Sequence, residues 1–199
     1  MTAWRRVLLI RHGVVDFDAP QEFRISPRGR QWDPPLSEEG RRQARALADR
    51  LVLMDAPAAI YVSPFRRCVE TIEPFAKRVG IDPVLEEDIG EVFIGSWEGL
   101  SFEEIVSGDE ELARRFREFE AMVHDNPSGD LVLVTHGGVI NSYFGQVLGI
   151  EEDMFFLPEN ASINTVMAEG EARRVRFLND TRHVTDPRVF VPPPPAMDE

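Results

Sequence analysis

The chain reads Val-Leu-Leu-Ile-Arg-His-Gly from residue 7 to residue 13. Four consecutive apolar residues are typical of a short β-strand buried on both faces, and Arg11 and His12 end this run at a polar loop. In sheets of parallel strands, ligands bind beyond the carboxyl ends of the strands. We therefore expect Arg11 and His12 to lie at a ligand-binding edge of a sheet.

Two later apolar runs end in the same way. Residues 59–62 stop at Ser63-Pro64, and residues 131–134 stop at Thr135-His136-Gly137-Gly138. Both runs have the length and composition of buried strands. Because the carboxyl ends of parallel strands meet at one edge, we expect the polar residues that follow all three strands to converge there.

Segments with helical spacing separate these strands. Ser37 has the side chain of a helix N-cap, and Gly80 and Gly149 are suitable stops for helices that precede them. The other expected elements are helices at about 37–54, 65–79, 101–124 and 139–148, and a hairpin with strands at 162–168 and 173–177. This alternation predicts an α/β fold, a three-layer sandwich whose mostly parallel central sheet is flanked by helices on both faces.

Length and composition fit one globular domain. The 199 residues are 43% hydrophobic and 29% charged, so we expect a single domain over residues 1–199, with a proline-rich tail at 192–199. No apolar run approaches the roughly 18–20 residues that a membrane-spanning helix needs, and the first apolar run is too short for a signal peptide. The single cysteine, Cys68, excludes an internal disulfide. We therefore expect a cytoplasmic protein that does not bind membranes.

The charge is distributed unevenly along the chain. The net charge of −13 argues against nucleic acid or an anionic membrane as the main partner. Residues 1–80 nevertheless carry 14 Lys or Arg against 10 Asp or Glu, whereas residues 81–199 carry 8 against 25. A locally positive site would suit a small anionic ligand, although a solvated acidic surface explains the same totals.

The residues expected to converge have the chemistry of phosphoryl transfer. Arg11 and either Arg66 or Arg67 supply guanidinium groups, which match phosphate oxygens in a bidentate fashion and stay charged. A neutral imidazole such as that of His12 can attack phosphorus, and His136 can donate to the transferring oxygens. A helix that begins near residue 138 would aim its backbone N–H groups at the same anion.

Other interpretations of the two histidines stay open at this point. Arg-His-Gly occurs by chance, and His12 could be a hydrogen-bonded core residue. His136 could ligate a metal or simply belong to a turn. Catalytic zinc takes three protein ligands, and the remaining histidines, His124 and His183, lie at no recognised ligand spacing. We therefore expect a site without a metal and a protein without a cofactor.

Longer motifs make a specific resemblance. The chain resembles the histidine phosphatase superfamily, the phosphoglycerate mutase-like proteins, and its motifs occur in the family's order. The matching segments are Leu9-Ile10-Arg11-His12-Gly13, residues 35–44, residues 63–71, Glu91 with residues 92–99, Val134-Thr135-His136-Gly137-Gly138, and Asn179-Asp180 followed by His183.

The resemblance implies a role for each matching residue. His12 would be the nucleophile that carries the phosphoryl group. Glu91 would protonate the leaving alcohol and then activate water, a task that suits a positioned carboxylic acid. By its distance from Ser63 in the motif, Arg67 rather than Arg66 would be the phosphate-binding arginine. The residues that would bind the phosphoryl group are Arg11, Arg67, His136 and Gly137.

The chain departs from the family pattern after the first motif. Family members commonly continue with Glu and Thr and often place an Asn a little later, whereas this chain has Val14 and Val15 and no asparagine before Asn126. One polar contact to phosphate is therefore missing or comes from elsewhere. The following loop carries three arginines that could bind a second anionic group of the substrate or be ordinary surface residues: Arg24, Arg28 and Arg30.

The expected function is that of a metal-independent phosphohydrolase, which acts on small phosphate monoesters through a covalent phosphohistidine. One alternative is a cofactor-dependent phosphoglycerate mutase, which uses the same site but returns the phosphoryl group to its substrate. A second is a catalytically weak binding protein with the same fold. The expected partner is a small phosphorylated metabolite, and the exposed edge of the hairpin at 162–177 could pair two copies into a homodimer.

Overall fold

The structure is a computed structural model, and it describes residues 4–20, 33–91, 110–125, 128–150, 152 and 154–185. Its strands are β1 (Arg5–Arg11), β2 (Ala59–Val62), β3 (Val84–Leu85), β4 (Leu131–Thr135), β5 (Ile163–Glu169) and β6 (Ala172–Asp180). Its helices are α1 (Glu38–Leu51), α2 (Arg66–Val79), the short 3-10 helix η2 (Glu87–Ile89), α4 (Glu110–Asp125), α5 (Gly137–Leu148) and α6 (Arg182–Thr185).

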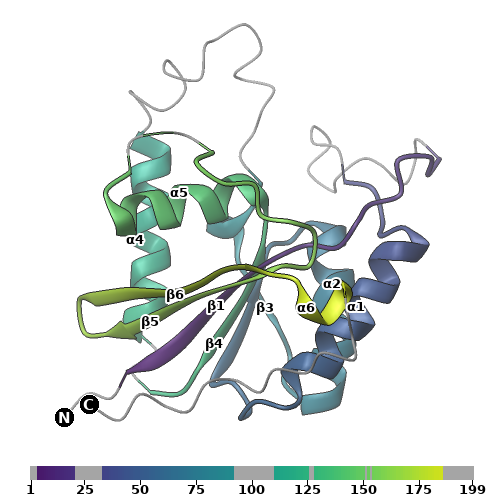
Figure 1. Ribbon diagram of the computed structural model, residues 1–199, viewed down its shortest axis with the longest axis horizontal. Helices are drawn as coiled ribbons and strands as arrows, with labels where there is room; N and C mark the ends of the chain where they lie inside the picture. Colours follow the sequence, from purple (N-terminus) through teal and green to yellow (C-terminus); the bar gives the residue numbers. More distant parts are fainter. Residues whose placement is uncertain are drawn as a thin grey trace, which may run out of the picture.

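The strands form one sheet in the order β3-β2-β4-β1-β5-β6 (Figure 1). Strands β3, β2, β4 and β1 run parallel, and the hairpin of β5 and β6 joins antiparallel beside β1. In the parallel part, Val134 of β4 pairs with both Ile10 of β1 and Val62 of β2. The ends of these three strands are therefore level, and the residues that follow them start from one edge of the sheet.

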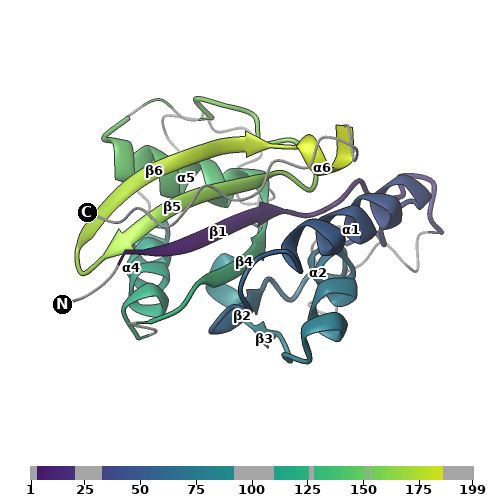
Figure 2. The same cartoon turned by 60° about the horizontal axis from the view of Figure 1, so that its bottom comes forward.

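Helices cover both faces of the sheet (Figure 2). On one face, α1 and α2 bury Leu47 and Ile72 against alternate residues of β1, β2 and β4. On the other face, α4 and α5 bury Phe119 and Phe144 against the intervening residues of β1 and β4. A strand that is covered on both faces needs apolar residues at consecutive positions, which explains the uninterrupted run in β1. The predicted three-layer α/β sandwich is confirmed.

Local signals fix where the helices begin and end. The Ser37 hydroxyl accepts a hydrogen bond from the Gly40 backbone N–H at 3.0 Å, as an N-cap does. Gly80 and Gly149 end α2 and α5 with positive φ angles of 69° and 66°, which glycine adopts without strain. Helix α5 begins at Gly137, two residues before the predicted start.

Some expected features lie outside the described residues: the start of the predicted helix at 101, the proline-rich tail, and Arg24, Arg28 and Arg30. Strand β3, helix η2 and helix α6 were not predicted. Among the described helices, none has both the length and the apolar character needed to cross a membrane.

Candidate active site

Five predicted site residues come together at the carboxyl edge of the sheet. Arg11 ends β1 and His12 follows it, His136 follows β4, and Arg67 lies in the first turn of α2, just beyond β2. Glu91 lies two residues beyond η2 and reaches the same place. Residues that are far apart in the sequence therefore share one site, although their chemical roles stay predictions.

The backbone and the ring of His12 are both held in place. Its N–H donates to the Thr135 carbonyl at 3.1 Å, and its carbonyl accepts from the Asn160 side-chain amide at 3.0 Å. Ring atom Nδ1 lies 2.8 Å from the Gly13 carbonyl oxygen. Because a carbonyl only accepts, Nδ1 must carry the proton, which leaves the lone pair on Nε2. The fold thus presents Nε2 of His12 as the reactive nitrogen.

The environment of His12 keeps its ring neutral. Burial, together with the positive charges of Arg67 and Arg11, lowers the pKa of His12 to about 3, and the hydrogen bond to Gly13 only partly opposes this shift. Its exposed fraction is 6%. Only a neutral imidazole has a lone pair with which to attack, so at neutral pH the site holds His12 in the nucleophilic form.

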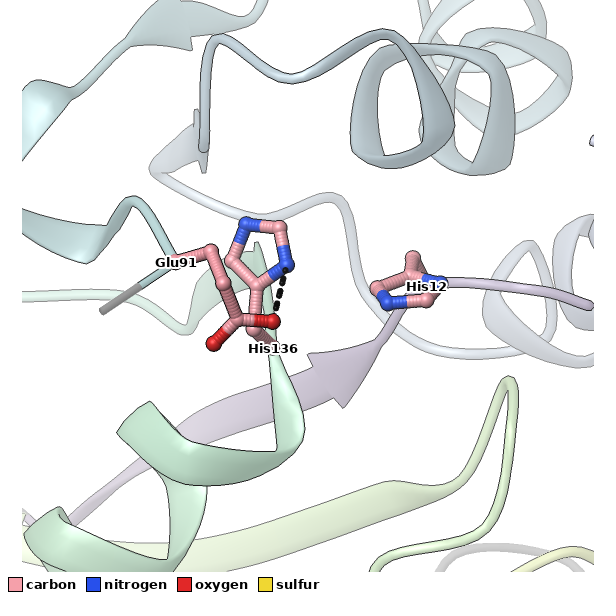
Figure 3. Close-up of side chains that lie close together, drawn as sticks. All are labelled: His12, Glu91 and His136. Carbon is pink, nitrogen blue, oxygen red and sulfur yellow. Dashed lines mark ion pairs between the residues drawn. The ribbon is translucent and has the colours of Figure 1, made fainter. Parts of the chain in front are cut away.

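His136 is fully buried and lies opposite His12 (Figure 3). The centroids of the two rings are 5.3 Å apart. Nε2 of His136 lies 2.7 Å from the Ser63 hydroxyl, and its Nδ1 lies 3.1 Å from Nη2 of Arg67 and 3.3 Å from Oε2 of Glu91. Nδ1 therefore lies between a donor, Arg67, and an acceptor, the Glu91 carboxylate: it offers a lone pair to the first or a proton to the second.

Arg67 is held by a carboxylate that sequence analysis did not identify. Its Nη1 lies 3.3 Å from Asp33, which is 1% exposed and also accepts from the Arg66 backbone N–H at 3.0 Å. Its Nη2 lies 3.6 Å from Glu91. Phe65 stacks against the guanidinium, 4.5 Å from ring centroid to carbon. The structure therefore places Arg67 in the site, while the backbone of Arg66 helps to hold Asp33.

Arg11 brings the second guanidinium group. Its Nη1 donates to the Pro158 carbonyl at 2.5 Å. Its Nε is buried and has no hydrogen-bond partner among the residues that the structure describes. A Cβ added to Gly137 would lie 3.5 Å from that Nε, so the first residue of α5 lies directly beside Arg11. A buried donor without a partner, at the start of a helix, suits an anion.

Three polar residues that sequence analysis did not single out support this arrangement. Thr71 accepts from the Gly13 N–H at 3.0 Å and donates to the Arg67 carbonyl at 2.6 Å. Asn160 and Asp33 hold His12 and Arg67, as described above. Thr71 lies within a motif that was matched to the family, but nothing in the local pattern around Asp33 or Asn160 indicates their partners.

The same cluster contains potential metal ligands. One ligand atom each from His12, Glu91 and His136 lies within 4.8 Å of the other two. Sequence analysis found no such set, because the three residues follow different elements and have no local spacing motif. The structure thus brings together a possible set of ligands that the sequence did not indicate, and the expectation of a site without a metal stays a prediction.

Comparison with known proteins agrees with this architecture. The model of the histidine phosphatase superfamily (branch 1) matches residues 7–121 and 107–181. A metal-independent phosphoserine phosphatase of Arabidopsis thaliana is 26% identical over 204 residues, which cover 90% of this chain and 83% of the relative. The solved structure of a phosphoserine phosphatase of Entamoeba histolytica with 3-phosphoglyceric acid superposes with a TM-score of 0.70, at 24% identity, over 90% of this chain and 99% of that one.

A third relative is longer than this chain. A bifunctional protein of Mycobacterium tuberculosis is 38% identical over 111 residues, which are 56% of this chain but only 29% of the relative. Its likeness is therefore restricted to one part of that protein. The family model, by contrast, spans most of the chain and includes the segments that carry Arg11, His12, Arg67, Glu91 and His136. The chain belongs to the histidine phosphatase superfamily (branch 1).

Proposed function

We propose that this protein is a phosphohydrolase that transfers the phosphoryl group of a small phosphate monoester to Nε2 of His12 and then to water. The observation that carries this proposal is the state of His12. Its ring is buried and neutral, its Nδ1 is tied to Gly13, and its Nε2 lies in a site with two guanidinium groups. This combination supplies a fixed nucleophile beside groups that stabilise a phosphoryl anion.

In the first step, Nε2 of His12 attacks phosphorus and the bond to the ester oxygen breaks. Arg11 and Arg67 neutralise the charge on the nonbridging oxygens, and the backbone at Gly137 adds the positive end of α5. The Arg11 Nε, which has no partner among the described residues, is a donor that this anion can satisfy. Glu91 gives its proton to the departing alkoxide.

In the second step, water takes the place of the alcohol. The Glu91 carboxylate removes a proton from this water as its oxygen attacks phosphorus, the N–P bond breaks, and inorganic phosphate leaves. In the structure, the Glu91 carboxylate lies against Arg67 and His136, two of the groups that would bind the phosphoryl oxygens. An arriving phosphoryl group must therefore displace it, which would move Glu91 toward the leaving oxygen.

Phosphoserine and related small monoesters are the first substrates to test. Two relatives are named as phosphoserine phosphatases, and one of them was solved with 3-phosphoglyceric acid bound. We expect the substrate to be a small phosphorylated metabolite of this class and the protein to be cytoplasmic. Strand β6 lies at the edge of the sheet and is the element through which a homodimer would pair.

The experiment is a screen of the purified chain against phosphoserine, 3-phosphoglycerate, p-nitrophenyl phosphate and a wider panel of monoesters, with and without a chelator. We expect phosphate release that survives chelation. His12→Ala should lose at least about 3 orders of magnitude in rate, or about 4 kcal/mol of transition-state stabilisation. The matched control is His124→Ala, because His124 is exposed and pairs with Glu171 instead. Wild-type turnover in His12→Ala would exclude the proposal.

A further inference from the structure

We propose that His12, His136 and Glu91 form a zinc-binding site when the phosphate site is empty. Zinc plays no part in the proposed hydrolysis. The ion would instead bind the ring nitrogen of His12 that attacks phosphorus. The observation behind this is the set of three ligand atoms, one from each residue, that lie within 4.8 Å of one another (Figure 3).

Both imidazoles are oriented as ligands of the same ion. Nδ1 of His12 is committed to the Gly13 carbonyl at 2.8 Å, so its lone pair is on Nε2. Nε2 of His136 contacts the Ser63 hydroxyl at 2.7 Å, which leaves Nδ1, beside Glu91, as the nitrogen that can bind the ion once it has no proton. Metal-bound histidines usually donate their other ring N–H to a carbonyl or similar acceptor, which fixes the ring and its tautomer. These two histidines already make that second contact.

Only some of the distances between the three ligand atoms must shorten for zinc to bind. Ligand atoms about 2.0–2.1 Å from a tetrahedral zinc ion lie about 3.4 Å from one another. The His136 Nδ1 and Glu91 Oε2 atoms are already 3.3 Å apart. The remaining adjustment is therefore to shorten the distance from these two atoms to the ring nitrogen of His12. The Glu91 side chain is 26% exposed and lies at the rim of the site, so it has room to follow.

The donor atoms also select the metal. Two imidazole nitrogens and one carboxylate suit zinc, which often takes three protein ligands and one water in sites of this kind. Mg²⁺ prefers oxygen ligands and keeps several of its waters, so it should not compete.

Arg67 and Arg11 set a limit on the affinity, because the two positive charges that lower the pKa of His12 also repel the ion. Nη2 of Arg67 lies 3.1 Å from the same His136 nitrogen, and a bound ion must displace it. The Arg67 guanidinium keeps its contact with the buried Asp33 at 3.3 Å, so its charge stays partnered after displacement. Because zinc takes the lone pair of His12, we expect it to inhibit whatever phosphoryl transfer His12 carries out.

The experiment is calorimetric titration of Zn²⁺ into the full chain after removal of metals with a chelator, which needs no substrate. We expect saturable binding of one ion and no heat with Mg²⁺ at the same concentration. His12→Ala and Glu91→Ala should each weaken zinc binding at least tenfold, with folding checked by circular dichroism. The control is His124→Ala, because the exposed pair of His124 and Glu171 is a competing surface site.

The outcomes separate this proposal from the phosphatase assignment. Zinc binding that both site variants retain, or that His124→Ala abolishes, overturns the zinc site whatever the catalytic activity is. Zinc binding that depends on His12 and Glu91 supports the site even in a chain that hydrolyses no monoester. Because Glu91 lies at the rim and not in the core, Glu91→Ala stays informative if His12→Ala fails to fold.

Discussion

Thr71 connects the loop that follows His12 to helix α2, which carries Arg67. Its buried hydroxyl accepts from the Gly13 N–H and donates to the Arg67 carbonyl, so it links the loop of the nucleophile to the helix that carries Arg67. Thr71→Val keeps the shape and removes this link, leaving the Gly13 N–H without its partner at a cost of about 1–3 kcal/mol. We expect kcat to fall about tenfold, measured with the best monoester.

The control for this variant is Thr71→Ser, which keeps the hydroxyl. It should recover most of kcat, although it loses a buried methyl group and with it some thermal stability. If both variants lower the melting temperature and neither changes kcat, Thr71 only packs the core and does not position the site.

The contribution of Glu91 to the rate of the first phosphoryl transfer should depend on the leaving group of the substrate. Glu91→Gln keeps the shape but cannot give a proton. For an alkyl ester such as phosphoserine, the first phosphoryl transfer should slow at least about 100-fold. For p-nitrophenyl phosphate, whose leaving group needs little protonation, the first-turnover rate should stay near wild type. Stopped-flow and rapid-quench measurements give both rates, and equal losses on the two substrates would show that Glu91 is not the acid.

At the scale of elements, the sequence predicts the long elements well and the short ones not at all. The strands β1, β2 and β4 are short apolar runs that end at polar residues, and the strands of the hairpin, β5 and β6, flank a Glu-Gly turn. Ser37 and Gly80 mark helix ends by chemistry that acts locally. Strand β3 has only two residues, both exposed, and helix α6 has only four residues, which are too few to show a period. Such elements form because neighbours that are distant in the sequence hold them.

Helix α6 gives a prediction about pH and stability. It packs on α1 and carries His183, which is 7% exposed. Burial lowers the pKa of His183 to about 4, although Asp180 partly opposes this shift. The unfolded chain binds a proton on this histidine below about pH 6.5, whereas the folded protein does not until about pH 4. The free energy of unfolding should therefore fall as the pH drops from about 6.5 to about 4.

Urea unfolding at several pH values tests this linkage. His183→Gln should show a shallower loss of stability between pH 6.5 and pH 4 than wild type, whatever its stability at neutral pH. His124→Gln, at an exposed histidine, is the matched control. A variant at His183 with the same pH dependence as wild type would mean that this histidine does not contribute to acid sensitivity.

At the scale of the whole molecule, the sheet assembles the site from distant segments. The rule that ligands bind beyond the ends of parallel strands was sufficient to predict that Arg11, His12 and His136 converge. It does not predict side-chain partners, because Asp33 and Asn160 reach the site through loops whose paths depend on tertiary packing. The same limit explains why the ligand set of His12, Glu91 and His136 was missed.

The short segment between residue 99 and β4 favours a hydrolase over a mutase. A mutase must keep water away from the phosphohistidine, which calls for a closed site with added cover. Between residue 99 and β4 the chain has room for little beyond α4. We expect incubation with 3-phosphoglycerate and a trace of 2,3-bisphosphoglycerate to give slow phosphate release, or none, and negligible 2-phosphoglycerate. Formation of 2-phosphoglycerate that outpaces phosphate release would favour the mutase.

The Glu91→Gln variant gives the most direct test of whether His12 carries the phosphoryl group. With ³²P-labelled p-nitrophenyl phosphate, the first transfer needs no proton donor, while the second lacks the base that activates water. Phosphoenzyme should therefore accumulate and be trapped by rapid quench. We expect one labelled group per chain that is acid-labile and base-stable and maps to His12. Label on any other residue, or release of p-nitrophenol in the first turnover without labelled protein, would contradict it.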